Sequence, residues 1–398
     1  MSLVAETGRH VGVDATCWML RRGFGRHARS LLGALVEVDT HNRYTFFVDS
    51  HEAVPLLPAG VGVRVVGSAS PAIVAASARG HRRLRDIVAM SRALSSGDLD
   101  VVLFPTLYSY VPTFGRARRF IIVHDATAEM YPELTLGGWK NRLFWTMKSV
   151  MGRHQADVLV TVSDYSRDTM VKRLGVSPDR LHVVGEASDA IFRVLDRPEP
   201  TARLRELHLD GSRRAIVYVG GFSPHKNLDM IVRVFDRLSR NRECADVDVV
   251  LVGDHDRESF LSCYESISAL VESLGLQSRV IFTGFLPDDD LVVLLNLATV
   301  LVLPSLTEGL GLPALEAAAC GCPVIATRES PLPGLLGEGG RYVDPRDDRS
   351  FEDALWQVLQ SAELRRQMRV AGITAARRLS WESAARRLAQ LIEDGVSR

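Results

Sequence analysis

Residues 300–316 read Val-Leu-Val-Leu-Pro-Ser-Leu-Thr-Glu-Gly-Leu-Gly-Leu-Pro-Ala-Leu-Glu, and this stretch decides the fold. The apolar run Val300–Leu303 predicts a buried strand, and Pro313 is typical of the first turn of a helix. The loop between them carries Gly309 and Gly311, which allow the backbone to come close to a ligand. A buried strand that leads through such a loop into a helix is the repeating unit of a parallel α/β sheet.

The same pattern recurs along the whole chain. Helical spacing separates most of the strands, as in 28–36 and 228–238, so the sequence predicts parallel sheets covered on both faces. The expected strands are 10–13, 44–48, 61–66, 101–104, 120–124, 158–162, 181–184, 215–219, 247–252, 280–282, 300–303 and 324–326.

The number of expected strands is too large for one sheet. A polar, proline-bearing stretch at 193–203 is typical of a linker, and a new series of strands and helices starts after it. We therefore expect two Rossmann-like, doubly wound parallel-sheet α/β domains that face each other across a cleft. The first would span residues 1–192 and the second 204–375, and a C-terminal helix in 376–398 is expected to pack back on the first domain.

The composition excludes several classes of protein. The 398 residues include 48 basic and 48 acidic ones, and 46% are hydrophobic, which is typical of a soluble globular chain. The zero net charge argues against a nucleic-acid partner. Five cysteines without a Cys-x-x-Cys pair indicate free thiols. The longest apolar stretch, 291–303, is shorter than the ~20 residues of a membrane span, and residues 1–8 lack the apolar core of a signal peptide. We expect a cytoplasmic protein.

The loop after Leu303 is the first candidate binding site. The amides at the start of the following helix form a ready anion site. Glu308 in the loop and Glu316 in the first helical turns can accept hydrogen bonds from sugar or ribose hydroxyls. The alternative is a helix-capping glutamate in an ordinary loop.

This segment resembles the E-x7-E signature of retaining glycosyltransferases with the GT-B fold, specifically family 4. The match continues through 317–325, Ala-Ala-Ala-Cys-Gly-Cys-Pro-Val-Ile. Further matching landmarks are 284–291, 343–345 and 380–382, so the resemblance covers nearly the whole chain.

The resemblance implies roles for individual residues of the donor site. Glu308 would face the donor sugar, and Glu316 would hold the nucleotide ribose. The backbone of Gly309, Leu310, Gly311 and Leu312 would line the phosphate side. Many relatives have Phe where this chain has Leu310, which is a mild departure.

A second candidate site follows the strand at 215–219. Gly220 and Gly221 form a turn before Lys226, one of only four lysines in the chain. A lysine here is a point charge suited to phosphate, and the resemblance makes it a diphosphate ligand. Many relatives have an additional Arg where this chain has Gly221 or His225, so His225 or an Arg from elsewhere is a candidate substitute. The alternative is a solvated lysine at a helix start.

The first domain carries the remaining candidates. His124 at the end of a strand would point into the binding cleft, and the resemblance places it beside the donor sugar. Asp125 would either orient His124 or cap a turn, and it is a weak acceptor-side candidate. The resemblance also implies that Gly23 and Gly25 offer amides to the diphosphate, with Arg26 on the acceptor side. The alternatives are a structural histidine and an ordinary flexible turn.

The implied activity is transfer of a sugar from a nucleotide-diphosphate sugar, a UDP- or GDP-sugar, to a hydroxyl of a small-molecule or glycan acceptor. The implied route is front-face substitution with retention, without a metal or other cofactor. The run 288–290, Asp-Asp-Asp, is expected to cap a helix at Leu291 rather than to bind metal. Two other classes stay open: a nucleotide-sugar epimerase on the same fold, and a non-catalytic sugar or nucleotide binder.

Basic residues gather at 79–85 and 116–119. They suggest peripheral contact with the inner face of an anionic membrane, and the alternative is a solvated arginine surface. The oligomeric state is not predicted.

Overall fold

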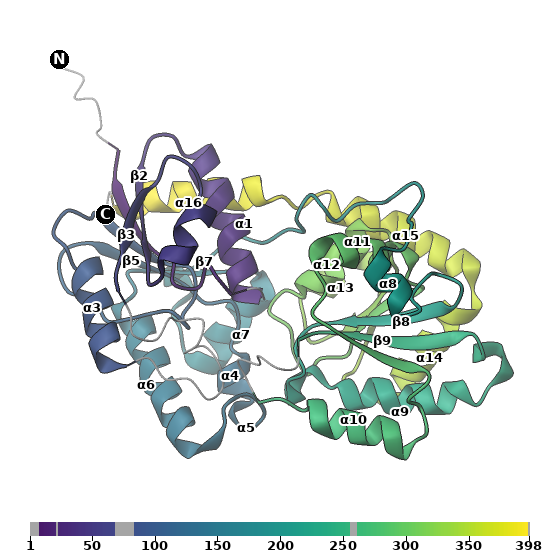
Figure 1. Cartoon of the computed structure of the whole chain (residues 1–398). Helices are drawn as coiled ribbons and strands as arrows, with labels where there is room; N and C mark the ends of the chain where they lie inside the picture. Colours follow the sequence, from purple (N-terminus) through teal and green to yellow (C-terminus); the bar gives the residue numbers. More distant parts are fainter. Residues whose placement is uncertain (1–7, 21–22, 68–82, 255–260, 397–398) are drawn as a thin grey trace. The chain divides into compact units, whose positions relative to one another are not determined.

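The computed structural model describes residues 8–20, 23–67, 83–254 and 261–396 (Figure 1). Within these ranges the chain forms two compact units. Unit 1 comprises residues 1–129, 138–186 and 380–398, and unit 2 comprises 130–137 and 187–379. No helix in the described ranges is long and apolar enough to cross a membrane.

Unit 1 is built on a seven-stranded parallel sheet with the order β3-β2-β1-β4-β5-β6-β7. Its strands are nearly all apolar because helices cover both faces. The strands are β1 (His10–Asp14), β2 (Arg43–Val48), β3 (Gly62–Val65), β4 (Val101–Phe104), β5 (Arg118–Ile122), β6 (Val158–Thr161) and β7 (Leu181–Val183). The main helices are α1 (Gly23–Val38), α3 (Leu84–Leu94), α6 (Gly138–Gln155), α7 (Asp164–Leu174) and α16 (Trp381–Val396), with the short α4 (Thr127–Met130) beside them.

Unit 2 is built on a six-stranded parallel sheet with the order β10-β9-β8-β11-β12-β13. Its strands are β8 (Arg214–Val219), β9 (Val247–Val252), β10 (Val280–Gly284), β11 (Val300–Leu303), β12 (Val324–Thr327) and β13 (Gly340–Val343). Its helices are α5 (Pro132–Thr135), α8 (Ala202–Glu206), α9 (Leu228–Ser239), α10 (Tyr264–Ser273), α11 (Asp288–Leu297), α12 (Leu312–Ala319), α13 (Leu332–Leu336), α14 (Asp348–Gln360) and α15 (Ala362–Ala376). These two sheets confirm the predicted fold class of two doubly wound parallel domains.

The last helix, α16, completes the core of unit 1. It packs along α1 and buries Ala385, Leu388 and Ile392 in the same cluster as Leu31 and Leu35. Figure 1 shows α16 beside α1, although the two helices lie at opposite ends of the sequence. The apolar residues of the C-terminal segment therefore pack against a helix from the other end of the chain.

Several local expectations were wrong in detail. The strand expected to end at His124 ends at Ile122, so His124 lies in the following loop. The helix expected over 28–36 already begins at Gly23, so Gly23 and Gly25 lie in its first turn. The aspartates 288–290 form the first turn of α11 rather than its cap, a place where the helix dipole favours negative charge. Strand β13 was not predicted because its sequence, Gly-Arg-Tyr-Val, is too polar to stand out.

The prediction of free thiols is confirmed. All five cysteines lie in the described ranges and none of them forms a disulfide bond; four of them are buried. Burial raises the pKa of the Cys320 thiol to about 12, so it stays protonated at neutral pH.

Candidate functional site

The strand order of unit 2 reverses between β8 and β11, and two of the predicted loops lie there. The chain that leaves β8 contains Gly220, Gly221 and Lys226, and the chain that leaves β11 contains Glu308. In doubly wound sheets, ligands bind outside the carboxyl ends of the strands at this reversal point. The topology therefore brings the two candidate loops of the second domain together.

An ion pair joins these two loops. Lys226 Nζ lies 2.8 Å from Glu308 Oε1, and Ser305 Oγ donates to the same oxygen at 2.6 Å. The Glu308 side chain is 11% exposed and that of Lys226 is 23% exposed. The backbone also holds the loops, because Leu306 N donates to His225 O at 2.8 Å. Ser305 was not predicted as part of the site, although it lies only three residues before Glu308.

Glycine is required at two points of this site. Gly311 has a φ of 85°, and a Cβ added to it would lie 2.8 Å from Leu332 Cδ1. It ends the loop immediately before α12, so Leu312 is the first helical residue. A Cβ on Gly253, at the end of β9, would lie 2.0 Å from the carbonyl oxygen of Gly220. The backbone after β8 is thus closely packed against the neighbouring loop.

The other residues of the E-x7-E segment lie around the start of α12. Glu316 is on the buried side of this helix and is 1% exposed. Leu310 is 6% exposed, so it packs inside the loop rather than reaching outward. Pro313 lies in the first turn of α12, as its sequence position predicted.

His225 does not supply a second positive charge at neutral pH. Burial lowers the pKa of His225 well below its usual value, and the neighbouring Lys226 ammonium lowers it further. Its imidazole is therefore neutral. Lys226 is the cation that this loop presents at its sheet edge.

The strand order of unit 1 reverses between β1 and β4, and His124 lies close to this point. A small cavity here is lined by Phe24, Tyr108, His124 and Trp145, among others. The ring of Phe24 stacks on Tyr108 with centroids 4.5 Å apart, and its centroid lies 5.0 Å from that of His124. The ring of Trp145 also stacks on Tyr108, with the two ring centroids 4.4 Å apart. Aromatic rings thus surround His124.

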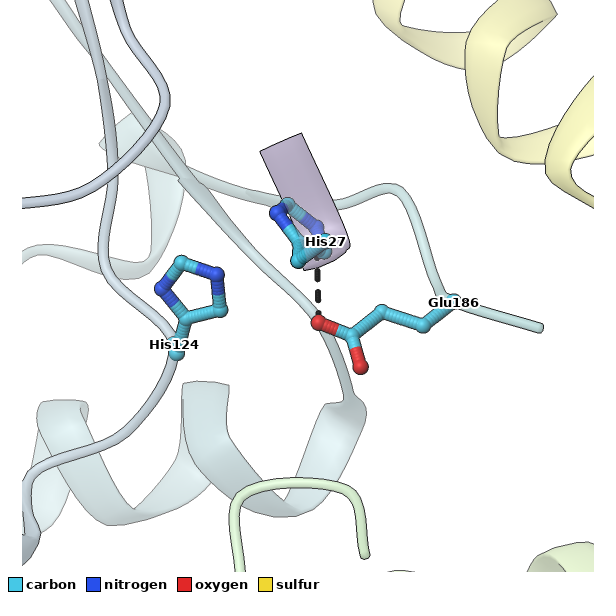
Figure 2. Close-up of side chains that lie close together, drawn as sticks. All are labelled: His27, His124 and Glu186. Atoms are coloured by element: carbon cyan, nitrogen blue, oxygen red, sulfur yellow. Dashed lines mark ion pairs between the residues drawn. The ribbon is translucent and has the colours of Figure 1, made fainter. Parts of the chain in front are cut away.

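His124 belongs to a cluster that the sequence did not reveal. Figure 2 shows His124, His27 and Glu186 close together, and the ring centroids of the two histidines are 4.4 Å apart. His27 Nε2 lies 3.3 Å from Glu186 Oε1. His27 follows the predicted Gly23–Arg26 segment directly, whereas Glu186 lies in a loop after β7 without a recognisable motif.

Both imidazoles of this cluster are neutral. Burial lowers the pKa of His124 to about 3. Burial also lowers the pKa of His27 well below its usual value, with His124 as the second cause. One ligand atom from each of His27, His124 and Glu186 lies within 4.8 Å of the others, so these three are the described residues that could hold a metal ion.

The remaining predicted residues of unit 1 lie at the start of α1 or after β5. A Cβ on Gly25 would lie 2.0 Å from the carbonyl oxygen of Leu20, so this glycine permits a close backbone approach. Gly23 is exposed and Arg26 is half-buried in the same turn. Asp125 accepts a hydrogen bond from Thr127 N at 2.8 Å, which is the turn-capping arrangement.

The two basic runs are only partly described. Residues 79–82 lie outside the described ranges. In the second run, Arg119 pairs with Asp157 at 3.3 Å, and Arg116 is exposed.

With the geometry established, the fold and sites define a two-domain protein of the GT-B class. The family sequence model described as "Glycosyltransferase Family 4" matches residues 21–189, and that described as "Glycosyl transferases group 1" matches residues 202–375. The chain belongs to glycosyltransferase family 4.

Two curated proteins illustrate the sequence similarity of this chain to known glycosyltransferases. The serotype-specific mannosyltransferase WbdA of Escherichia coli is 26% identical over 265 residues, which are 66% of this chain and 32% of WbdA. The D-inositol 3-phosphate glycosyltransferase of Acidothermus cellulolyticus is 31% identical over 246 residues, which are 61% of this chain and 54% of that protein. The chain thus spans about a third of the length of WbdA and about half that of the second relative.

Solved structures share the fold. The sucrose-phosphate synthase of Thermosynechococcus elongatus has a TM-score of 0.73 and 19% identity, covering 97% of this chain and 98% of its own. The Anabaena protein Alr3699/HepE, in complex with UDP-glucose, has a TM-score of 0.72 and 14% identity, covering 97% and 99%. At these identities the likeness shows the fold alone.

Proposed function

We propose that this protein is a retaining glycosyltransferase that takes a sugar from a UDP- or GDP-sugar and transfers it to an acceptor hydroxyl. The observation that carries the proposal is the Lys226–Glu308 pair at the reversal point of the unit 2 sheet. A cation and a carboxylate held there match the two ends of a sugar diphosphate. The cation suits the diphosphate, and the carboxylate suits the sugar hydroxyls.

The leaving group needs charge neutralisation. In front-face substitution the bond between the anomeric carbon and the diphosphate oxygen breaks while the acceptor oxygen bonds to the same face. The acceptor proton passes to the departing diphosphate oxygen, so no protein nucleophile is required. Lys226 and the amides at the start of α12 would stabilise the charge that develops on the diphosphate. Glu316 would hold the ribose, and Gly220 and Gly221 would allow the diphosphate to approach the backbone.

Unit 1 would contribute the neutral His124 and the acceptor-side residues. A buried neutral imidazole can donate to and accept from hydroxyl groups without competing as a cation for the diphosphate. Gly23 and Gly25, in the first turn of α1, would offer amides, and Arg26 would lie on the acceptor side. Asp125 would act there through the loop that it caps.

The relatives support the choice of substrate class. WbdA is a mannosyltransferase, other relatives are D-inositol 3-phosphate glycosyltransferases, and the Anabaena neighbour has been solved in complex with UDP and with UDP-glucose. A sugar nucleotide as donor and a glycan or small polar molecule as acceptor follow by analogy.

Metal independence is part of the proposal. Lys226 offers at the diphosphate the charge that a divalent ion would otherwise provide. His27, His124 and Glu186 are where an ion could bind in unit 1. A chelator should therefore leave transfer unchanged, and loss of activity that added Mg²⁺ or Mn²⁺ restores would contradict this part of the proposal.

A panel of sugar nucleotides tests the main proposal. UDP-, GDP-, ADP- and dTDP-sugars are compared by thermal shift, and mass spectrometry then follows transfer to candidate acceptors. We expect one nucleotide to stabilise the protein and its sugar to appear on an acceptor. Epimerised donor in the absence of acceptor would instead favour an epimerase, and binding without turnover would favour a sugar-nucleotide binder.

The basic residues 79–85 and 116–119 stay a prediction of membrane contact. Arg116 is the exposed member of the described second run.

A further inference from the structure

Helix α6 of unit 1 exposes most of its large apolar side chains instead of burying them. Six large apolar residues, each between 41% and 70% exposed, lie on its outer surface, and we name this set the α6 apolar face. Its members are Trp139, Leu143, Phe144, Met147, Val150 and Met151. At 3.6 residues per turn they fall within an arc of about 140° on the helix. An exposed apolar face of this kind marks an interaction site.

The opposite side of α6 is already in use. Trp145, Ser149 and Gly152 are buried against unit 1. Trp145 Nε1 donates to Glu129 at 3.1 Å, and a Cβ on Gly152 would lie 2.6 Å from Leu107. The helix is therefore held in one rotational setting, and its apolar face cannot turn inward to become buried.

The charged residues of α6 are all basic. The helix contains Lys140, Arg142, Lys148, Arg153 and His154, and it contains no Asp or Glu. Two of the four lysines of the whole chain lie on it. Lys140 projects from the middle of the apolar arc, and its ammonium lies 5.7 Å from the centroid of the Trp139 ring. Tryptophan, leucine and phenylalanine together with basic residues are typical of helices that lie in the surface of a membrane.

Phe114 is a further exposed apolar residue, in a loop that is hydrogen-bonded to the C-terminal end of α6. It is 68% exposed, and its own backbone N donates to Ser95 at the end of α3. The preceding Thr113 N donates to Gln155, the last residue of α6. The exposed Arg116 follows two residues later. This loop therefore adds one exposed aromatic residue and one exposed arginine next to the end of α6.

We propose that the α6 apolar face docks unit 1 on a bilayer that contains anionic lipid. The apolar side chains would enter the boundary between headgroups and acyl chains, and Lys140 and Arg142 would contact lipid phosphates. The charge distinguishes this occupant from a second copy of the chain. In a symmetric dimer through this face, two α6 helices that expose Lys140 and Arg142 and contain no Asp or Glu would meet, and their charges would repel each other.

Docking also gives α6 a place in the proposed function. The inner side of the helix supplies Trp145 to the cavity that contains His124. The outer side would meanwhile contact lipid, so this cavity would lie within about one helix diameter, roughly 10 Å, of the bilayer. This consequence rests on the proposed function, whereas lipid binding itself can be measured without any donor.

Vesicle sedimentation of the full chain tests the proposal. We expect binding to phosphatidylcholine vesicles with 30 mol% phosphatidylglycerol, and about 100-fold weaker partitioning for Phe144→Ser/Met147→Ser. Lys140→Ala/Arg142→Ala should lose about 10-fold or more on anionic vesicles and little on pure phosphatidylcholine. The matched control is Val370→Ser, which removes a similarly exposed apolar side chain on α15 and should bind as the wild type does.

Two results would overturn the proposal. One is wild-type protein that stays in the supernatant, or a Phe144→Ser/Met147→Ser variant that binds as well as Val370→Ser. The other is a lipid-free dimer, seen by analytical ultracentrifugation, that this double substitution converts to monomer. Circular dichroism and Tm confirm folding, and because the replaced side chains are exposed, both should be unchanged.

Discussion

Glu308→Gln gives the sharpest test of the donor site, because it removes one charge and keeps the shape of the side chain. In the structure Glu308 holds the ammonium of Lys226 at 2.8 Å. At that separation the Coulomb attraction is about 6 kcal/mol for an effective dielectric constant of about 20. The loss of hydration offsets most of it, which leaves a net interaction of roughly 1 to 2 kcal/mol. A diphosphate that recruits Lys226 must overcome this net interaction.

The variant should therefore bind nucleoside diphosphate more tightly while transferring sugar more slowly. Release of Lys226 predicts a Kd for UDP, or for whichever nucleotide the panel selects, about 5- to 30-fold lower, measured by isothermal titration calorimetry. Loss of the carboxylate from the sugar end predicts a fall in kcat of about 100-fold or more. Glu338→Gln is the matched control, since its carboxylate in the same unit is 90% exposed and pairs with Arg341 instead of Lys226. This control should change neither quantity.

The two measurements separate the possible roles of Glu308. If Glu308→Gln binds nucleoside diphosphate no better than Glu338→Gln, the idea that Glu308 and the diphosphate compete for Lys226 is refuted. If binding tightens but kcat is unchanged, Glu308 regulates Lys226 without acting on the sugar. Either outcome would require a different assignment of the E-x7-E segment.

Three further predictions follow from the same structure. Lys226→Ala should lower kcat/KM by about 100-fold or more and weaken nucleoside diphosphate binding, because the loop loses its charged partner for the diphosphate; steady-state kinetics with calorimetry would show it, and unchanged kcat/KM would count against the proposed role. Gly311→Ala should lower the free energy of unfolding by about 1 to 3 kcal/mol, since its φ is 85° and its Cβ position is occupied, whereas Gly334→Ala, with open space around it, should not; urea titration compares the two, and equal stability would contradict the conformational argument. Burial lowers the pKa values of His27 and His124, so below about pH 6.5 the unfolded chain takes up protons that the folded chain does not. The free energy of unfolding should therefore fall by up to about 1.4 kcal/mol per pH unit for each histidine as the pH drops further. His124→Asn should flatten that slope in urea titrations between pH 7 and 5, and an unchanged slope would show that His124 is not buried in its neutral form.

Local sequence patterns were sufficient for most of the second domain, with the exception of strand β13. Strand Val300–Leu303 and the helix at Pro313 were predicted within a residue or two because apolar runs, glycine and proline constrain the backbone directly. The spacing from Lys226 to Glu308 says nothing about contact, but the order of a doubly wound sheet places both loops at one edge. For this site, motif and topology together led to the residues that the structure brings into contact.

The first domain was harder to predict for a physical reason. His27, His124 and Glu186 come from α1 and from the loops after β5 and β7, and only sheet packing makes them neighbours. Their neutral imidazoles result from burial, which the sequence does not state. The exposed face of α6 was missed because its Trp, Leu, Phe and Met residues look like an ordinary core-facing pattern.

The sequence by itself determined most of the strands and helices, that they form two parallel α/β domains, and which loops carry glycine, lysine and glutamate. These properties depend on interactions between residues close in the chain, so they can be read locally. The tertiary structure decided that Lys226 pairs with Glu308, that Asp125 caps a turn, and that α6 buries Trp145 while exposing its other apolar side chains. Those outcomes depend on packing between distant segments, which fixes both the rotation of a helix and the surroundings of a charge.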